Sequence, residues 1–333
     1  MAEHPPAGET GIIQTYFAPL AADTPGAFGL NDDAGLIQPP DGFEIVLTTD
    51  MIIGGIHYLD NAAPQDIAYK ALGVNVSDLC AKGADPAVYL LSIALPENPD
   101  PAWLEGLRDG FAEAQSDFGC MLLGGDTVHT TGPVAISITA AGHVPEKGMV
   151  RRSGAEKGDF VYVTGTIGDA ALGLLLMKES TGTQTVSREQ ADHLKSRYRR
   201  PQPRMSAIAL VREHANAAMD ISDGLVGDFS KLCAASGAGG VLNAADVPLS
   251  SAAAAWLGQR PSDLEHVLTG GDDYEILMCV SQKHTAPFED ACAAHGLQVT
   301  RIGEIVSPDK DGVRVLDRDG SAIKFAHQSY DHF

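Results

Sequence analysis

Aspartates recur at the ends of apolar, strand-like segments or in glycine-rich turns of this sequence. The set comprises Asp32 and Asp33 in GLNDDAG, Asp50 in TTDMIIGGIH, Asp78 in VNVSDL, Asp126 in LLGGDT, Asp220 and Asp223 in MDISDG, and Asp272 and Asp273 in GGDDYE. Aspartate is a poor strand former, and buried carboxylates repel one another unless a cation neutralises them. Carboxylates with neighbouring hydroxyls, such as those of Thr48, Thr49 and Ser222, are the hard oxygen ligands that Mg²⁺ prefers. Because Mg²⁺ usually binds one or two carboxylates plus substrate phosphates, the dispersed set indicates several ions on one polyphosphate.

Each of these aspartates also has a purely structural explanation. An aspartate that follows a strand is often a helix N-cap or the start of an Asx-turn. Asp223 could cap a helix that begins near Gly224, and Asp100 is expected to cap the helix from Pro101. Capping does not require six such patterns, however, and so the whole set favours metal and phosphate binding.

The standard nucleotide and hydrolase signatures are missing. The sequence has no G-x-x-x-x-G-K-[ST] motif, no kinase H-R-D or D-F-G set, no G-x-S-x-G and no H-E-x-x-H. The glycines of Gly165–Gly168 do not fit G-x-G-x-x-G, and they indicate a tight turn between a strand and a helix. Phosphates must then be held by metal and arginine, for which Arg151 and Arg152 are candidates, although a solvated surface pair fits them equally.

Charge and composition restrict the partners. The chain has 44 acidic and 23 basic residues, a formal charge of −21, which repels nucleic acids and anionic membranes, so neither is an expected partner. An anionic substrate can still bind if divalent cations stand between it and the protein. The five cysteines include no C-x-x-C pair, which argues against zinc or disulfide frameworks and for small buried side chains. A secretory signal pattern is absent and the longest apolar run is too short to span a bilayer, so a cytoplasmic location is expected.

The order of apolar patterns predicts an α/β protein. In the first part we expect strands at Glu44–Thr49, Val88–Leu95, Cys120–Leu123 and Val134–His143, with helices at Pro64–Cys80 and Pro101–Phe118. In the second part we expect strands at Asp159–Thr164, Tyr274–Val280, Val299–Ile305 and Gly312–Leu316, with helices at Asp169–Met177, Ser187–Tyr198, Pro203–His214 and Gly224–Ala235. A chain of 333 residues exceeds one compact core, and the polar segment Pro145–Lys157 is a candidate linker. We therefore predict two α/β domains, residues 1–148 and 149–333.

In order and spacing, the motifs resemble the thiamine-monophosphate kinase family, within the superfamily that includes aminoimidazole ribonucleotide synthetase. The resemblance covers nearly the whole chain and is carried by GLNDDAG, TTDMIIGGIHY, YKALGVNVSDLCAKGADP, LLGGDT, RRSGAEKGD, GTIGDAALGL, RYRRPQPR, AMDISDGL, LTGGDDYEI and the terminal YDHF. Two positions differ from the usual family pattern. Asn31 stands where the family usually has glycine, which predicts a differently shaped loop, and Asp272 stands where it often has the longer glutamate.

The resemblance implies roles for particular residues. The implied magnesium ligands are Asp33, Thr48, Thr49, Asp50, Asp78, Asp126 and Asp220, with Asp223 binding a further ion. The implied ATP contacts are Gly125, Asp126, Arg152 and Ser222, of which Asp126 and Arg152 act on the transferring group. Thiamine monophosphate would contact His57, Asp272 and Tyr330, with the tyrosine stacking on the cationic rings. From the residues alone, His57 and Tyr330 are more simply explained as structural side chains.

The resemblance also implies a reaction and an assembly. The reaction is direct, in-line transfer of the γ-phosphoryl group of ATP, the co-substrate, to thiamine monophosphate, with several Mg²⁺ ions relieving the repulsion between two polyanions. The N-terminal sheet would pair with its twin to form a dimeric barrel, and a C-terminal α/β sandwich would close over the nucleotide.

The sequence leaves two other functions open. Other members of the superfamily resemble the chain in binding ATP through such aspartates. Aminoimidazole ribonucleotide synthetase is the least easily excluded of them, although His57 and Tyr330 fit the thiamine-monophosphate kinase family better. The hydrogenase-maturation member ends in a cysteine, whereas this chain ends in Tyr330–Phe333, and the selenophosphate synthetase commonly carries an N-terminal cysteine, whereas the first one here is Cys80. A nucleotide or metal sensor without catalysis is the alternative from another class, and formation of ADP that depends on the acceptor would distinguish it.

Overall fold

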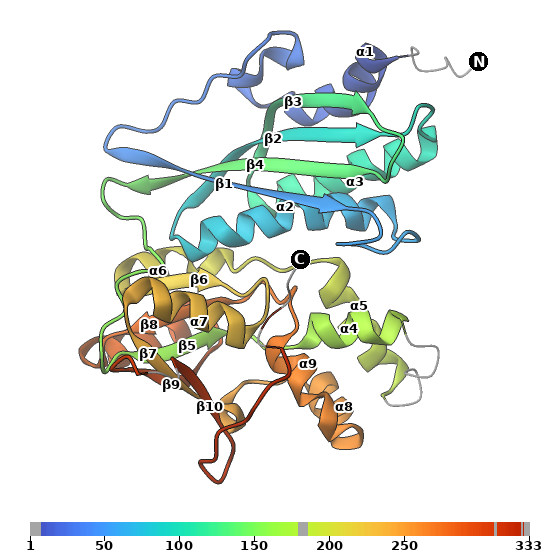
Figure 1. The fold of residues 1–333 in the computed structure, drawn as a ribbon. Helices are drawn as coiled ribbons and strands as arrows, with labels where there is room; N and C mark the ends of the chain where they lie inside the picture. Colours follow the sequence, from blue (N-terminus) through green and yellow to red (C-terminus); the bar gives the residue numbers. More distant parts are fainter. Residues whose placement is uncertain (1–7, 179–185, 310–311, 328, 330–333) are drawn as a thin grey trace. The chain divides into compact units, whose positions relative to one another are not determined.

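The computed structural model divides the chain into two compact units, Met1–Leu79 with Ala84–Lys147 and Cys80–Gly83 with Gly148–Phe333. The residues that it describes are 8–178, 186–309, 312–327 and 329. Each unit combines one sheet with helices, which is the mixed α/β organisation expected from the sequence (Figure 1). Neither sheet closes into a barrel within the described chain, because each has two open edge strands. Over the described residues, no helix has the length and apolarity needed to cross a membrane.

Unit 1 is built on a four-stranded sheet of order β1-β4-β2-β3. The strands are β1 (Phe43–Ile53), β2 (Asp85–Leu95), β3 (Met121–His129) and β4 (Ala135–Pro145). β4 is antiparallel to both β1 and β2, and β2 is parallel to β3. The long helices α2 (Pro64–Ala81) and α3 (Pro101–Phe118) lie along one face of this sheet (Figure 1). In β1, Val46 and Ile52 are buried whereas Leu47 and Met51 are exposed, as strand alternation requires when helices cover one face.

Short helices precede this sheet in the chain. They are α1 (Glu9–Ile12), the π-helix η1 (Ile13–Phe17), and the 3₁₀ helices η2 (Ala18–Ala21) and η3 (Pro25–Leu30). Tyr16, Phe17 and Leu20 are buried, and Gln115 of α3 donates a hydrogen bond to the Leu20 carbonyl over 3.1 Å. These contacts fix the N-terminal segment on unit 1, beside the loop that carries Asp32 and Asp33.

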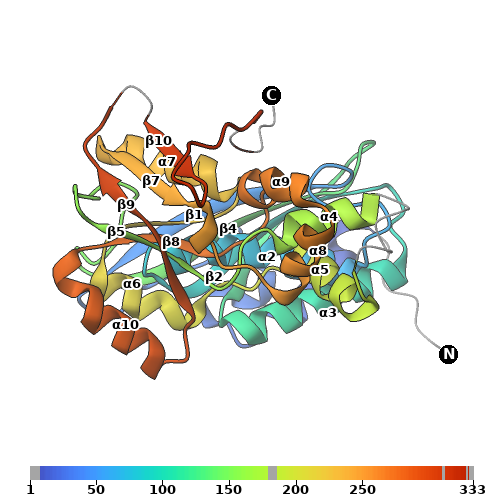
Figure 2. The same ribbon diagram turned by 90° about the horizontal axis from the view of Figure 1, so that it is seen from below.

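Unit 2 is built on a mixed sheet of order β10-β7-β9-β5-β8-β6, which is antiparallel except for the pair β10–β7. The strands are β5 (Phe160–Thr164), β6 (Ala215–Asp220), β7 (Gly239–Asn243), β8 (Ile276–Val280), β9 (Val299–Val306) and β10 (Val313–Leu316). The helices are α4 (Asp169–Lys178), α5 (Arg188–Arg199), α6 (Ile208–His214), α7 (Leu225–Ser236), α8 (Ser251–Gln259), α9 (Leu264–Thr269) and α10 (Thr285–Ala294). Phe229, Trp256 and Leu277 belong to its apolar core. The view from below shows α6 and α10 together on one side of the sheet (Figure 2).

Two of the predicted strands are longer than expected, which changes the setting of two aspartates. β1 continues past Thr49 to Ile53 and β3 continues past Leu123 to His129, so Asp50 and Asp126 lie within strands and not after them. The reason is backbone pairing: β1 stays in register with β4 and β3 with β2 beyond the apolar residues. The prediction that these aspartates follow strand ends was therefore wrong, although the strands themselves were expected.

Local signals at helix ends were mostly correct. Asp100 caps α3 by accepting a hydrogen bond from the Ala102 N–H over 3.1 Å. Ser187 caps α5 and forms a capping box with Gln190. Asp223 does not cap α7, because the N-cap of that helix is Gly224 and no side chain caps it. The helix predicted over Pro203–His214 is shorter: a 3₁₀ turn at Met205–Ala207 precedes α6.

Candidate functional site

A cavity of about 670 Å³ in unit 1 brings two of the aspartate motifs together. Asp32 and Asp33 line it from the loop after η3, and Asp126 and Thr127 line it from β3. Ile13, Phe17, Leu30 and Ile37 add apolar surface to the same cavity. A concave site with an apolar wall and a few carboxylates has the general form of a small-molecule site.

Gly125 is needed where β3 passes β2. A Cβ on this residue would lie 1.8 Å from the carbonyl oxygen of Leu91. Any other residue would therefore push the two strands apart and displace Asp126, the next residue along β3. The second glycine of G-G-D is thus explained by close strand packing in addition to any contact with a ligand.

A second oxygen-rich group joins β1 to α2. The Thr48 hydroxyl donates a hydrogen bond to Oδ2 of Asp78 over 2.6 Å, and the Asp50 N–H donates to the side-chain carbonyl of Asn75 over 3.0 Å. Thr49 behaves differently: its hydroxyl donates to the Ile138 carbonyl and accepts from the Thr139 hydroxyl, both over 3.1 Å.

The sheet register separates these side chains between two faces. Thr49 pairs with Thr139, Thr139 with Leu90, and Leu90 with Gly124, so the side chains in this row lie on one face of the sheet. Asp126 is two residues after Gly124 in β3 and therefore lies on the same face. Thr49 and Asp126 thus share the face opposite the helices, whereas Thr48 points to Asp78 of α2. The predicted magnesium ligands of unit 1 do not all converge on one point.

The turn after β1 holds His57 by its ring. Nδ1 of His57 accepts a hydrogen bond from the Ile53 N–H over 3.1 Å, and the His57 carbonyl accepts from Nζ of the buried Lys70 over 3.1 Å. Since Nδ1 is an acceptor here, the neutral imidazole carries its proton on Nε2. The hydrogen bond at Nδ1 therefore fixes the ring of His57 on the backbone of the turn.

In unit 2, the buried carboxylate of Asp228, which was not predicted from the sequence, holds the backbone of the MDISDG segment. Asp220 is the last residue of β6, and the N–H groups of Ser222 and Asp223 both donate to Oδ2 of Asp228, over 3.0 and 2.9 Å. Lys231 forms ion pairs with Asp223 and with Asp228. Burial raises the pKa of Asp228, against the opposing effect of Lys231. These two hydrogen bonds to Asp228 fix the backbone of Ser222 and Asp223.

The GGDDYE turn lies against this segment through backbone hydrogen bonds. The Asp272 N–H donates to the Ser222 carbonyl over 2.9 Å, and the Tyr274 N–H donates to the Ile221 carbonyl over 2.8 Å. Gly271 allows this approach, because a Cβ there would lie 2.3 Å from the Ser222 carbonyl oxygen. Asp272 and Ser222 therefore come together although fifty positions separate them in sequence.

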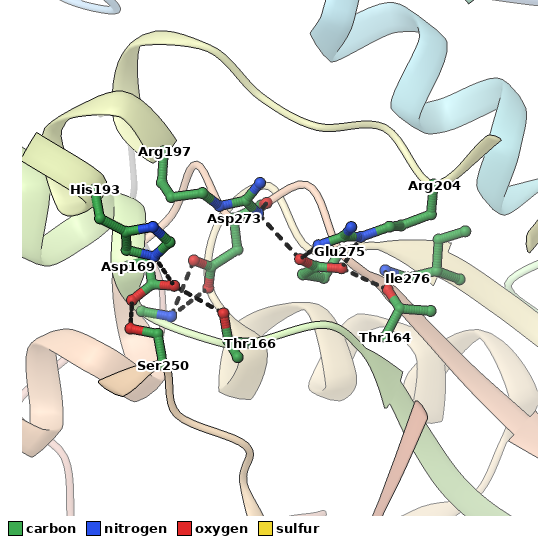
Figure 3. Close-up of polar contacts among 11 residues, drawn as sticks. Thr164, Thr166, Asp169, His193, Arg197, Arg204, Ser250, Asp273, Glu275 and Ile276 are labelled. Atoms are coloured by element: carbon green, nitrogen blue, oxygen red, sulfur yellow. Dashed lines mark hydrogen bonds and ion pairs between the residues drawn. The ribbon is translucent and has the colours of Figure 1, made fainter. Parts of the chain in front are cut away.

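A buried ionic cluster supports the same turn (Figure 3). Glu275, fully buried, accepts hydrogen bonds from Thr164 (2.6 Å), from Arg197 (3.0 Å) and from Nε of Arg204 (2.6 Å). Both oxygens of Asp273 accept from the Gly168 N–H at 2.9 Å. Burial raises the pKa of Asp273 well above its usual range, against the opposing effects of the Gly168 N–H and Arg197.

The oxygen donors suit magnesium, but they are dispersed. Across the described parts of the chain, no group of three or more His, Cys, Asp or Glu side chains is close enough to hold a metal ion. Mg²⁺ is commonly held by one or two carboxylates together with phosphate oxygens and water. Thr48 with Asp78, and Asp126 in its cavity, fit that kind of partial site, in which the nucleotide supplies the remaining ligands.

Comparison with known proteins decides the family. The model of the AIR synthase related protein N-terminal domain matches residues 31–144, and that of the C-terminal domain matches residues 156–316. The thiamine-monophosphate kinase of Escherichia coli (strain K12) is 36% identical over 327 residues, which cover 98% of each chain. The chain belongs to the thiamine-monophosphate kinase family.

Solved structures agree with this membership. The crystal structure of the thiamine-monophosphate kinase from Stenotrophomonas maltophilia K279a has a TM-score of 0.83 and 32% identity, covering 97% of this chain and 98% of that chain. AaThiL, whose structure is a complex with AMPPCP and TMP, has a TM-score of 0.76 and 30% identity over 98% and 97% of the two chains. The two-domain fold expected from the resemblance is therefore the fold of the thiamine-monophosphate kinase family.

Two further residues implied by the thiamine-monophosphate kinase resemblance have little structural context. Arg152 is exposed, and its carbonyl accepts a hydrogen bond from Ser236 over 3.2 Å, which fixes its backbone beside α7. Tyr330 lies outside the described residues.

Several residues around these motifs were not predicted from the sequence. They are Asp228, Lys231, Arg197, Arg204, Tyr274 and Glu275. Arg197 and Arg204 stand in RYRRPQPR, one of the motifs that carry the thiamine-monophosphate kinase resemblance, and Glu275 ends GGDDYE. The concentration of charged residues in these motifs was the available signal, but it did not indicate which residues pair.

Proposed function

We propose that this protein transfers the γ-phosphoryl group of ATP directly to the phosphate of thiamine monophosphate, in line, giving thiamine diphosphate and ADP. The observation that carries the proposal is membership of the thiamine-monophosphate kinase family over 98% of the chain. The ligands of AaThiL, AMPPCP and TMP, correspond in kind to the two substrates proposed here. The acceptor is already an anionic phosphate, so the protein needs no strong base and has mainly to overcome charge repulsion.

The proposed metal ligands contribute oxygen atoms from both units. In unit 1 they are Asp33, Thr48, Thr49, Asp50, Asp78 and Asp126, and in unit 2 they are Asp220 and Asp223. Bound magnesium would neutralise phosphate charge and polarise the transferring group. The Thr48–Asp78 hydrogen bond would orient that carboxylate before any ion binds. Since the Thr49 hydroxyl is held by Thr139 and Ile138, we expect Thr49 to contribute its main-chain carbonyl.

ATP would be contacted by Gly125, Asp126, Arg152 and Ser222. The exposed guanidinium of Arg152 is suited to a phosphate, with which it can form two parallel hydrogen bonds. The Ser222 N–H already donates to Asp228, so we expect the Ser222 hydroxyl to make its contact.

Thiamine monophosphate would be held by His57, Asp272 and Tyr330. The Nε2–H of His57 is a suitable donor to the substrate phosphate, because the ring is anchored through Nδ1. The carboxylate of Asp272 complements the positive charge of the thiazolium ring, and the aromatic ring of Tyr330 would stack on it.

We further propose that the protein is a homodimer whose unit 1 sheets face each other. Leu47 and Met51 of β1, Leu90 of β2 and Val128 of β3 are 66%, 52%, 41% and 49% exposed. The strand register places all of them on the face opposite α2 and α3. Exposed apolar residues grouped on one sheet face are typical of a protein–protein interface.

The deciding experiment measures products and not binding. The purified protein is incubated with ATP, Mg²⁺ and thiamine monophosphate, and ADP and thiamine diphosphate are quantified together. We expect equal amounts of both, loss of both with EDTA, and no ADP when thiamine monophosphate is replaced by another phosphate ester. ADP formed without the acceptor, or equal transfer in EDTA, would refute the proposal, and nucleotide binding without any ADP would indicate a sensor.

A further inference from the structure

The turn that carries Asp272 has an uncommon backbone. Asp272 and Tyr274 both have left-handed conformations, with φ of 72° and 51°. Residues with a Cβ adopt this region rarely, and it persists where the surrounding structure imposes it. The position of the Asp272 side chain therefore depends on the contacts that keep the backbone of this turn in place.

Two sets of contacts hold the turn. Backbone hydrogen bonds attach it to MDISDG, including one from the Ile221 N–H to the Glu275 carbonyl over 2.8 Å. Between the two left-handed residues, the buried Asp273 turns inward and accepts from the Gly168 N–H (Figure 3). Asp273 points into the protein, whereas Asp272, the left-handed residue just before it, is partly exposed.

Tyr274 makes direct contact with the Asp272 carboxylate. Its hydroxyl donates to Oδ1 of Asp272 over 3.1 Å, and its own side chain is 9% exposed. A buried ring loses little further freedom when a ligand binds, so it is a rigid support for a more exposed carboxylate. The hydrogen bond restricts rotation of the carboxylate about its terminal torsion, which is otherwise broad.

We propose that Tyr274 is a positioning residue for the phosphoryl acceptor, acting through Asp272. This inference rests on the proposed function, in which Asp272 binds the cationic part of thiamine monophosphate. Tyr274 sets the direction of that carboxylate. The hydrogen bonds between Asp273 and the Gly168 N–H fix the backbone of the turn. The same backbone ladder reaches Ser222, a proposed ATP contact, so the turn relates the acceptor contact to a nucleotide contact within unit 2.

A double-mutant cycle tests the inference. The four proteins are the wild type, Tyr274→Phe, Asp272→Ala and the double variant. Tyr274→Phe removes only the hydroxyl, and we expect it to raise KM for thiamine monophosphate about 10-fold, the usual size for a lost hydrogen bond to a charged group. KM for ATP should change less than twofold. In the Asp272→Ala background the same change should have no further effect, because the group through which it acts is missing.

The matched control is Tyr162→Phe. Tyr162 is also buried in unit 2 and donates to a carboxylate, Oε1 of Glu289 on α10, over 2.6 Å, and it pairs with Met278 of β8 and not with a residue of the turn. We expect its KM for thiamine monophosphate to equal that of the wild type. Thermal unfolding and calorimetric binding of thiamine monophosphate are measured for every variant, so that a loss of affinity is separated from a loss of fold.

The outcomes distinguish this inference from the function on which it rests. If Asp272→Ala leaves KM and binding of thiamine monophosphate unchanged, the assigned role of Asp272 fails, and the inference fails with it. If Asp272→Ala weakens binding but Tyr274→Phe does not, the inference alone is refuted. Equal and additive effects of Tyr274→Phe in both backgrounds, or an equal effect of Tyr162→Phe, would likewise refute positioning through Asp272.

Discussion

The hydroxyl of Thr48 donates a 2.6 Å hydrogen bond to Oδ2 of Asp78, linking the middle of β1 to the last turns of α2. Asp78→Asn keeps an acceptor for Thr48 but removes the negative charge. If Asp78 binds magnesium as proposed above, kcat/KM at a fixed Mg²⁺ concentration should fall about 100-fold, the upper end of the loss typical for a residue that supports a metal site. Steady-state rates over a series of Mg²⁺ concentrations measure this, and the half-saturating concentration should rise. Asp66→Asn, at the start of the same helix, should behave like the wild type.

Glu275 and its two arginines predict a large effect on stability. Glu275→Gln leaves Arg197 and Arg204 next to a neutral side chain in a site where Glu275 is fully buried. Breaking a buried pair on one side typically costs about 3–5 kcal/mol, because a charge stays uncompensated. Urea unfolding followed by circular dichroism measures the change.

The control for that prediction is the exposed pair Arg188–Asp192 on α5, 3.9 Å apart with side chains 96% and 67% exposed. Asp192→Asn should change the free energy of unfolding by less than about 0.5 kcal/mol, as exposed ion pairs do. If the two variants lose similar stability, the buried cluster does not have the stabilising role assigned to it.

Asp273 gives a prediction about pH. Burial raises its pKa well above the usual range, so the folded chain binds this proton more tightly than the unfolded chain. The resulting stabilisation is complete below the unfolded pKa of about 3.9 and is lost as the pH rises through the folded pKa. Asp273→Asn removes the ionisation, and so its melting temperature relative to the wild type should increase from about pH 5 to about pH 8.

Differential scanning calorimetry in matched buffers checks this sign. Asp290→Asn, an exposed position on α10, should show a constant difference from the wild type over the same range. A difference for Asp273→Asn that shrinks as the pH rises would mean that the carboxylate is more acidic in the folded state.

The cysteines provide a simple test of the core. All five are free and buried, and burial raises the pKa of Cys120 to about 12, of Cys233 to about 12 and of Cys292 to about 11. Because the thiolate is the reactive form, native protein should react slowly with a disulfide reagent such as DTNB. All five thiols should react after unfolding in guanidinium, and rapid reaction of native protein would contradict the described packing.

Sequence alone predicted some of the elements whose ends carry local signals, but it missed α8, which Ser250 caps. Pro101 begins α3 and Gly119, with φ of 64°, ends it, while Ser187 caps α5. The sequence did not predict β6, Ala215–Asp220, because ANAAMD has little strand propensity and forms a strand through its pairing with β8. Tertiary pairing also extended β1 and β3 past their apolar residues.

In the candidate site, too, the sequence predicted some residues and missed others. The aspartates could be selected from local patterns, since each stands beside glycines or hydroxyls. The partners could not be predicted, because Glu275 meets Arg204 across 71 positions and Thr164 across 111. Such contacts depend on which strands become neighbours, and periodicity does not contain that information. Strand alternation alone places Thr48 and Thr49 on opposite faces, but which of the two faces α2 depends on the same tertiary packing.

The apolar face of the unit 1 sheet gives the last prediction. If two such faces pack together, Leu47→Glu places a charge in each half of the interface, where no partner would neutralise it. We expect the dimer to dissociate into monomers in sedimentation velocity at micromolar concentration, with the circular dichroism spectrum retained because Leu47 is 66% exposed within one chain. Met149→Glu, the same kind of change at a 42% exposed apolar residue of unit 2, should remain dimeric. A wild type that is monomeric, or a Leu47→Glu variant that stays dimeric, would show that this face is not the interface.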